Sequence, residues 1–87
     1  MYHHAYTIAR TARFNNCHVI SVHRDYNTIG QTQWGVYIGT DRWGGFKETV
    51  AATRKEAIER ALDIAAASEG FIKEVWAQHG REFKLIH

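Results

Sequence analysis

The stretch from Trp34 to Gly70 constrains the fold most, because it contains a strand, a turn, a second strand and a helix in unbroken succession. Apolar residues alternate with other residues in 34–38 and 46–50, as they do in strands with one buried face. Gly44 and Gly45 between these runs can adopt positive φ without steric cost, which predicts a hairpin turn. The side chains expected on the buried face are Trp34, Val36, Ile38, Phe46 and Val50.

A helix is predicted to begin near Thr53, because Thr53 and Glu56 have the spacing of a capping box, in which each side chain binds a free backbone N–H. Apolar residues, mostly alanine, recur at steps of three and four in the following turns, so the helix can approach a sheet closely. On its solvent side an ion pair is expected between Glu56 and Arg60. Gly70 is expected to end the helix in the left-handed conformation.

Further strands are predicted on both sides of this stretch, at residues 17–24, at residues 71–77 and after a turn at residues 79–81. A polar loop at residues 25–30 joins the first of them to the strand at Trp34. The expected fold class is α+β, with an antiparallel sheet of about five strands in the order β-β-β-α-β-β and one amphipathic helix packed on one face. Alternation at Tyr2, His4, Tyr6 and Ile8 allows an extra N-terminal strand. The length predicts a single domain, residues 1–87.

The composition is that of an ordinary globular protein, with 45% hydrophobic residues, 23% charged residues and a formal net charge of +2. This mild basic bias permits an acidic partner such as nucleic acid without requiring one. The single Cys17 excludes an internal disulfide and favours a reducing compartment, so a cytoplasmic location is expected. No secretory signal and no apolar run of membrane-spanning length are recognised, so a membrane is not an expected partner.

Three short motifs stand out: the aromatic strand W34-G-V-Y-I, the helix start T53-R-K-E-A57 and the turn H79-G-R81 before a closing strand. Together they resemble a family of short bacterial and phage domains of unknown function. The similarity covers roughly residues 18–86, and it implies the fold alone, since the function of that family is not known. The chain departs from the family in its longer N-terminus and in the hairpin residues Arg42 and Trp43.

The strand W34-x-V-x-I, Phe46 in the next strand and T53-x-x-E56-A57 at the helix start carry a second resemblance, in topology. It is to plant ethylene-response-type domains and the arm-binding domains of phage integrases. That likeness implies that the sheet face turned away from the helix enters a DNA groove. The dense arginine pattern of those families on this face is not reproduced here.

The candidate binding residues follow from the predicted faces of the sheet. If the helix covers Trp34, Val36 and Ile38, the opposite face presents basic and aromatic side chains beside the hairpin tip. These residues are Arg42, Trp43, Tyr37, Lys47, Arg24 and Gln33, and Thr49 is expected with them. Interleaved aromatic and basic residues suit both nucleic-acid stacking and protein interfaces. Cover of this face by the later strands or by a second protomer is the alternative.

Neither metal binding nor catalysis is indicated by the spacing of reactive residues. The six histidines, His3, His4, His18, His23, His79 and His87, match no zinc pattern, since adjacent side chains of a strand point to opposite faces. Cys17, a nearby histidine and Asp25 include the residue types of a nucleophilic triad, yet no nucleophile elbow or glycine-rich loop accompanies them. We therefore expect no enzyme activity, no catalytic or metal-binding residue and no cofactor.

Two functional hypotheses remain. The first is a small non-enzymatic binding module of phage type that engages a host protein or nucleoprotein through the aromatic and basic hairpin, for example as an inhibitor of the anti-CRISPR kind. The second is a DNA-binding domain that uses the exposed sheet face. Nucleic acid and a homodimer partner both stay open.

Overall fold

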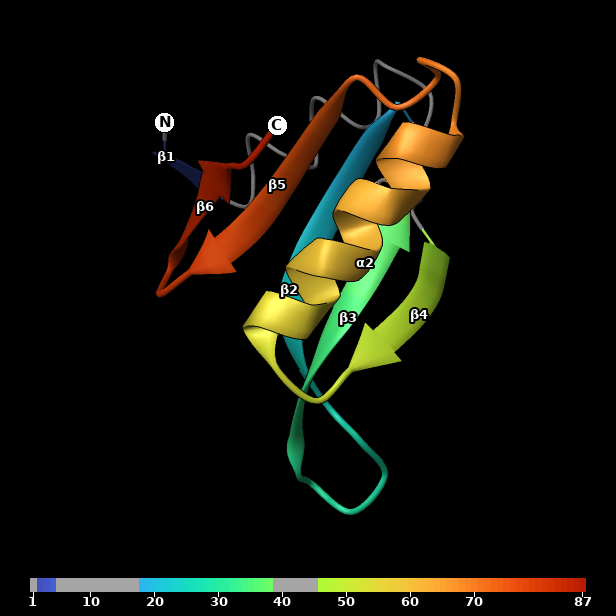
Figure 1. The fold of residues 1–87 in the computed structure, drawn as a ribbon. Helices are drawn as coiled ribbons and strands as arrows, with labels where there is room; N and C mark the ends of the chain where they lie inside the picture. The colour runs from blue at the N-terminus through green and yellow to red at the C-terminus, as the bar shows by residue number, and fades with distance from the viewer. Residues whose placement is uncertain (1, 5–17, 39–45) are drawn as a thin grey trace.

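The computed structural model describes residues 2–4, 18–38 and 46–87 and shows an α+β fold, in which one helix crosses a sheet (Figure 1). In the described ranges the elements are β1 (Tyr2–His4), β2 (Val19–Tyr26), β3 (Thr32–Ile38), β4 (Phe46–Ala51), α2 (Arg54–Ala67), β5 (Glu74–His79) and β6 (Glu82–Leu85). The predicted order β-β-β-α-β-β is confirmed for β2 to β6, and β1 adds the N-terminal strand. The predicted hairpin turn at Gly44 and Gly45 lies outside the described residues.

The sheet is mixed, so the prediction of an antiparallel sheet was wrong. Its strands lie in the order β1-β6-β5-β2-β3-β4, and β2 pairs in parallel with β5. The helix is the cause. β2, β3 and β4 form the predicted meander, which makes β4 run in the direction of β2. α2 then carries the chain back over the sheet, so β5 runs in the direction of β4 and therefore parallel to β2.

α2 covers the sheet face that was predicted from the alternation around Trp34. Its residues Ala57 and Ala61 are fully buried and Ala65 is 9% exposed, and they contact Val36 and other aliphatic side chains of the sheet. Alanine has almost no side-chain bulk, so the helix lies close to β2 and β3 (Figure 1). This layer forms the main hydrophobic core.

A bulge in β4 changes which of its residues face the helix. Tyr37 pairs with Lys47 but Val36 pairs with Thr49, so Glu48 is an extra residue in the ladder. The alternation is therefore shifted by one position after the bulge. Ala51 joins the core in place of the expected Val50, and Thr49 faces α2 rather than the outer side.

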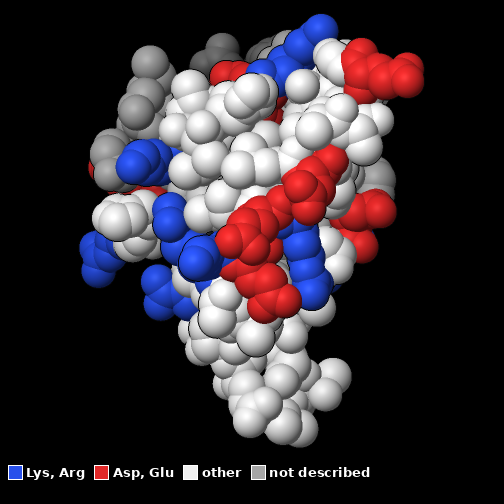
Figure 2. All heavy atoms as spheres, in the orientation of Figure 1, with Lys and Arg blue, Asp and Glu red and all other residues white. Residues whose placement is uncertain are grey.

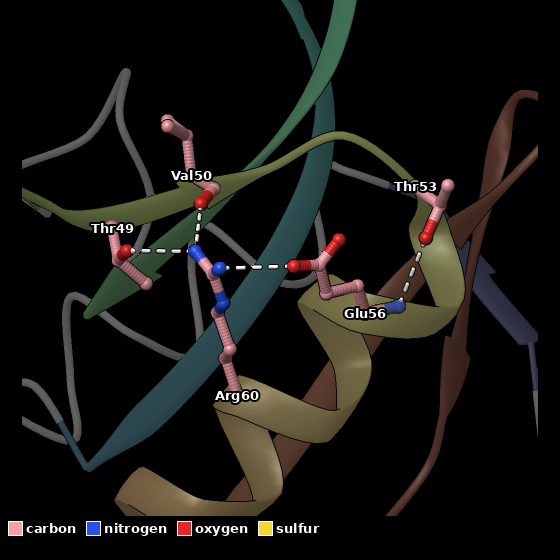
Figure 3. Close-up of polar contacts among 5 residues, drawn as sticks. All are labelled: Thr49, Val50, Thr53, Glu56 and Arg60. Atoms are coloured by element: carbon pink, nitrogen blue, oxygen red, sulfur yellow. Dashed lines mark hydrogen bonds and ion pairs between the residues drawn. The ribbon is translucent and has the colours of Figure 1, made fainter.

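Arg60 of α2 joins the helix to β4, which is one edge strand of the sheet (Figure 3). Its guanidinium donates to the Val50 carbonyl, to Thr49 Oγ1 at 3.4 Å and to Glu56 Oε1 at 2.9 Å. The predicted Glu56–Arg60 ion pair is thus confirmed. The capping box forms in part: Thr53 Oγ1 accepts from the Glu56 N–H at 3.2 Å, while the Glu56 carboxylate is directed to Arg60.

The chain between α2 and β5 differs from the prediction of a strand that begins at Phe71. The helix ends at Ala67, and Glu69 and Gly70 both have positive φ, at 55° and 86°. The Phe71 N–H then donates to the Ser68 carbonyl at 3.1 Å. This compact turn delays the start of β5 to Glu74.

Candidate binding surface

The hairpin formed by β2 and β3 extends beyond the rest of the sheet. β5 pairs with β2 only over Val19–Val22, and β4 pairs with β3 only from Trp34 onwards. β2 and β3 continue to pair with each other as far as Tyr26 and Thr32. Residues 24–33, which we call the ribbon, therefore form a two-stranded projection at one end of the molecule (Figure 1).

Asn27 holds the tip of the ribbon in one conformation. Its Oδ1 accepts from the backbone N–H groups of Ile29 and Gln31, at 3.0 and 2.9 Å, and its Nδ2 donates to Gln31 Oε1 at 3.1 Å. Gly30, at φ 82°, closes the turn by donating to the Asn27 carbonyl. This turn leaves two large apolar side chains outside, because Ile29 is 75% exposed and Tyr26 is 62% exposed.

The ribbon beyond Asp25 carries no charge. The sequence has no Lys, Arg, Asp or Glu between Asp25 and Asp41. In Figure 2 the projection is accordingly free of acidic and basic atoms, whereas the body above it carries both kinds. Exposed apolar, amide and hydroxyl groups thus make up the tip.

Asp25 anchors the root of the ribbon to the outer face of the sheet, the face turned away from α2. Its Oδ2 accepts from the Tyr37 hydroxyl at 2.9 Å and from Lys47 Nζ at 2.6 Å. The Lys47 hydrogen bond, assisted by bonds from the Tyr26 N–H and Tyr37, holds the pKa of Asp25 below its ordinary value. The same partnership raises the pKa of Lys47. Both groups therefore stay charged at neutral pH.

Tyr37 links this anchor to the body of the outer face. Its ring packs edge-on against His23, with centroids 4.9 Å apart, and His23 in turn contacts Phe83 at 4.8 Å. His23 Nε2 also shares a hydrogen bond of 2.8 Å with Ser21 Oγ. Next to these rings, Val19, Trp76 and Phe83 form a second buried cluster.

Gly35 makes room for the Tyr37 ring. A Cβ at position 35 would lie 2.7 Å from Tyr37 Cε2, which is shorter than any van der Waals contact. Tyr37 lies back over its own strand at this point, toward Asp25. The glycine is therefore part of the anchor of the ribbon.

The structure brings together only some of the residues predicted to bind a partner. Tyr37 and Lys47 meet on the outer face, but Tyr37 is 4% exposed and Lys47 is engaged by Asp25. Gln33, half-buried, pairs with Asp25 in the ribbon itself. The predicted residues Arg42 and Trp43 lie outside the described residues.

Arg24 lies on the face opposite to the one expected. It shares the alternation of Ile20 and Val22, and its guanidinium carbon lies 5.8 Å from the centre of the Trp34 ring, on the helix side. The exposed tip residues Tyr26 and Ile29 were not among the predicted binding residues. The uncharged run that contains them is the signal that could have identified them.

The reactive residues do not assemble into a catalytic or metal site among the described residues. No group of three His, Cys, Asp or Glu side chains there could hold a metal ion. Ser21 is close to His23 but fully buried, so its hydroxyl is closed to a substrate. Cys17 lies outside the described part of the chain. No helix described is long and apolar enough to cross a membrane.

Comparisons of this chain with protein-family models, with curated proteins and with solved structures returned no match. The geometry of the ribbon and its surroundings therefore carries the functional argument.

Proposed function

We propose that this protein is a non-enzymatic binding module that engages a host protein or nucleoprotein through its ribbon. The observation that carries this proposal is the exposure of Ile29 and Tyr26 on a turn that Asn27 holds in place. A fold of this size gains nothing in stability from an exposed isoleucine at a loop tip. Burial of that side chain in a partner would instead contribute about 1.5–3 kcal/mol.

The anchoring of the ribbon supports the same function. A loop that is already ordered loses little conformational entropy when it binds, and that entropy is a major cost of association. The Asn27 bonds order the tip, and the Asp25–Tyr37–Lys47 contacts order the root. The ribbon is thus presented to a partner in a preorganised form.

Sheet-face DNA binding receives less support from the geometry. The outer face would need accessible aromatic and cationic side chains, but Tyr37 is buried and Lys47 is neutralised by Asp25. The hairpin at Arg42 and Trp43 stays a prediction, as does the role of a host inhibitor.

Site-specific photo-crosslinking tests the proposal in cells of the natural host. A photoreactive phenylalanine analogue at position 29 is expected to form one dominant adduct, and the same analogue at the exposed position 69, in the turn after α2, is the matched control. The adduct is identified by mass spectrometry and its affinity is then measured with purified components. Equal affinity of the Ile29→Asp variant and the native chain for that partner would refute the use of the ribbon.

A further inference from the structure

Three segments that carry arginines meet at the root of the ribbon: β2 with Arg24, the start of α2 with Arg54 and the β5–β6 turn with Arg81. Gln78 at the end of β5 connects them: its Oε1 accepts from the Arg24 backbone N–H at 2.8 Å, and its carbonyl accepts from Arg54 Nε at 2.9 Å. Its Nε2 donates to the Gly80 carbonyl at 3.0 Å, directly before Arg81. We call Arg24, Arg54 and Arg81 the basic corner.

The basic corner is not neutralised by the described part of the chain. Arg24 and Arg81 are exposed, and none of the three arginines forms an ion pair with a described carboxylate. Figure 2 shows basic atoms from the start of α2 toward the β5–β6 turn, beside the point where the uncharged projection emerges, with acidic atoms next to them at the start of α2. The acidic side chains of this view lie mainly along α2. Positive charge and a neutral projection thus lie next to each other.

This juxtaposition matches the two needs of a duplex-reading protein. Cationic side chains contact phosphates and fix the position of the protein, while uncharged groups contact base edges in a groove. The exposed tip offers hydroxyl, amide and methyl groups, which are the groups that recognise bases and the thymine methyl in the major groove. They belong to Thr28, Ile29, Gln31 and Thr32.

The length and width of the ribbon also agree with the size of a DNA groove. Between Arg24 and Asn27 the strand advances about 10 Å at about 3.3 Å per residue, and the major groove of B-DNA is about 8.5 Å deep. That groove is about 12 Å wide and admits a two-stranded ribbon. The major groove of A-form RNA is too narrow for side chains to read. A duplex of the B form is therefore the ligand that fits.

We propose that the ribbon enters the major groove of duplex DNA and that the basic corner binds the phosphates beside it. This inference rests on the proposed function, since it takes the nucleoprotein alternative and names its duplex DNA as what the ribbon contacts. It differs from sheet-face recognition, because the outer face and Lys47 take no part. Arg24, Arg54 and Arg81 bind phosphate, and Ile29 lies against the bases.

Fluorescence anisotropy with a labelled duplex of mixed sequence, about two turns long, tests the inference on the full chain. Binding is expected at about 50 mM salt and should weaken at about 200 mM, with a slope of log K against log salt near −3 for three phosphates at about −0.9 each. Arg24→Gln and Arg81→Gln should each weaken binding and reduce the slope by about 1. Arg24→Lys keeps the charge and should retain the slope.

Lys73→Gln is the matched control, because it removes one exposed cation at the other end of β5. It should leave both affinity and slope nearly unchanged. For the tip, Ile29→Asp should abolish binding, whereas Phe71→Asp places the same charge on another exposed hydrophobic side chain and should not. Thermal unfolding of each variant verifies that the fold is retained.

Four outcomes would overturn the inference: no binding at low salt, an equal loss in Lys73→Gln and Arg24→Gln, no effect of Ile29→Asp, or equal affinity for single-stranded and duplex DNA. A protein adduct at position 29 together with the first outcome would leave the proposed binding function intact and assign the ribbon to a protein surface. The failure of the inference and the failure of the proposed function are therefore distinguishable.

Discussion

Gly35→Ala is expected to destabilise the protein by displacing Tyr37 from the root of the ribbon. The new Cβ would lie 2.7 Å from Cε2 and 3.0 Å from Cζ of Tyr37. The ring cannot simply turn away, because Tyr37 is 4% exposed, contacts His23 and donates its hydroxyl to Asp25. Relief of the overlap must therefore break contacts that anchor the ribbon.

The magnitude follows from three contributions. Overpacking costs about 1–3 kcal/mol. Loss of the hydrogen bond from Tyr37 to the Asp25 carboxylate costs about 1.5–3 kcal/mol. Replacing glycine in a strand returns about 0.5–1 kcal/mol. The free energy of unfolding should therefore fall by about 1.5–5.5 kcal/mol, which urea denaturation followed by circular dichroism measures easily.

A double-mutant cycle isolates the cause. In a Tyr37→Ala background the overlap is absent, so Gly35→Ala should be neutral or stabilise by up to about 1 kcal/mol. The coupling free energy between positions 35 and 37 should then be at least about 1.5 kcal/mol. If Gly35→Ala costs the same in both backgrounds, the glycine is not needed for the Tyr37 ring and the reasoning fails.

Three further predictions concern α2 and the anchor. Arg60→Ala should lower the free energy of unfolding by about 1–2 kcal/mol, because the Val50 carbonyl loses its donor. Arg60→Lys should recover only part of that free energy, since lysine lacks the planar guanidinium. Urea denaturation of both variants measures these changes. Thr53→Ala should cost about 1 kcal/mol by the same assay, because the Glu56 N–H loses its cap, whereas Thr53→Ser should cost little. Because folding lowers the pKa of Asp25, its contribution is present above the unfolded pKa of about 3.9 and is lost as pH falls through the folded pKa. The stability difference between the native chain and Asp25→Asn should therefore shrink in acid, and a constant difference down to pH 2 would contradict the anchor.

Local features of this fold could be predicted from sequence because they depend on neighbouring residues. The cap at Thr53, the alanine stripe of α2 and the buried face at Val36 need only the periods of helix and strand. The parallel pairing of β2 with β5 depends instead on where the helix returns the chain, which no local pattern encodes. The bulge at Glu48 could not be predicted either, since a period-two pattern does not show where one residue is inserted.

In the candidate site, too, local turns could be predicted from the sequence and contacts between strands could not. Asn27 and Gly30 are residue types that favour turns, so the loop at residues 25–30 could be predicted from the sequence. How far the ribbon projects depends on where β4 and β5 stop pairing with β3 and β2. The anchor joins Asp25 to Lys47 across the sheet, which requires the register of β3 with both neighbours. Sequence reasoning identified Lys47 as a binding residue, whereas the structure gives it a partner within the chain.

The position of Arg24 depends both on the local strand pattern and on the tertiary fold. Its alternation with Ile20 and Val22 places it on the helix face, and pairing with Trp34 places it where β5 ends and α2 begins. Only the tertiary fold then brings Gln78 to its backbone and Arg54 to Gln78. Cations separated along the chain therefore gather at the root of a ribbon that itself has none beyond Asp25. Because phosphate attraction is long-ranged while base contacts require a close neutral surface, this separation of charge from tip would orient the ribbon toward a groove before contact.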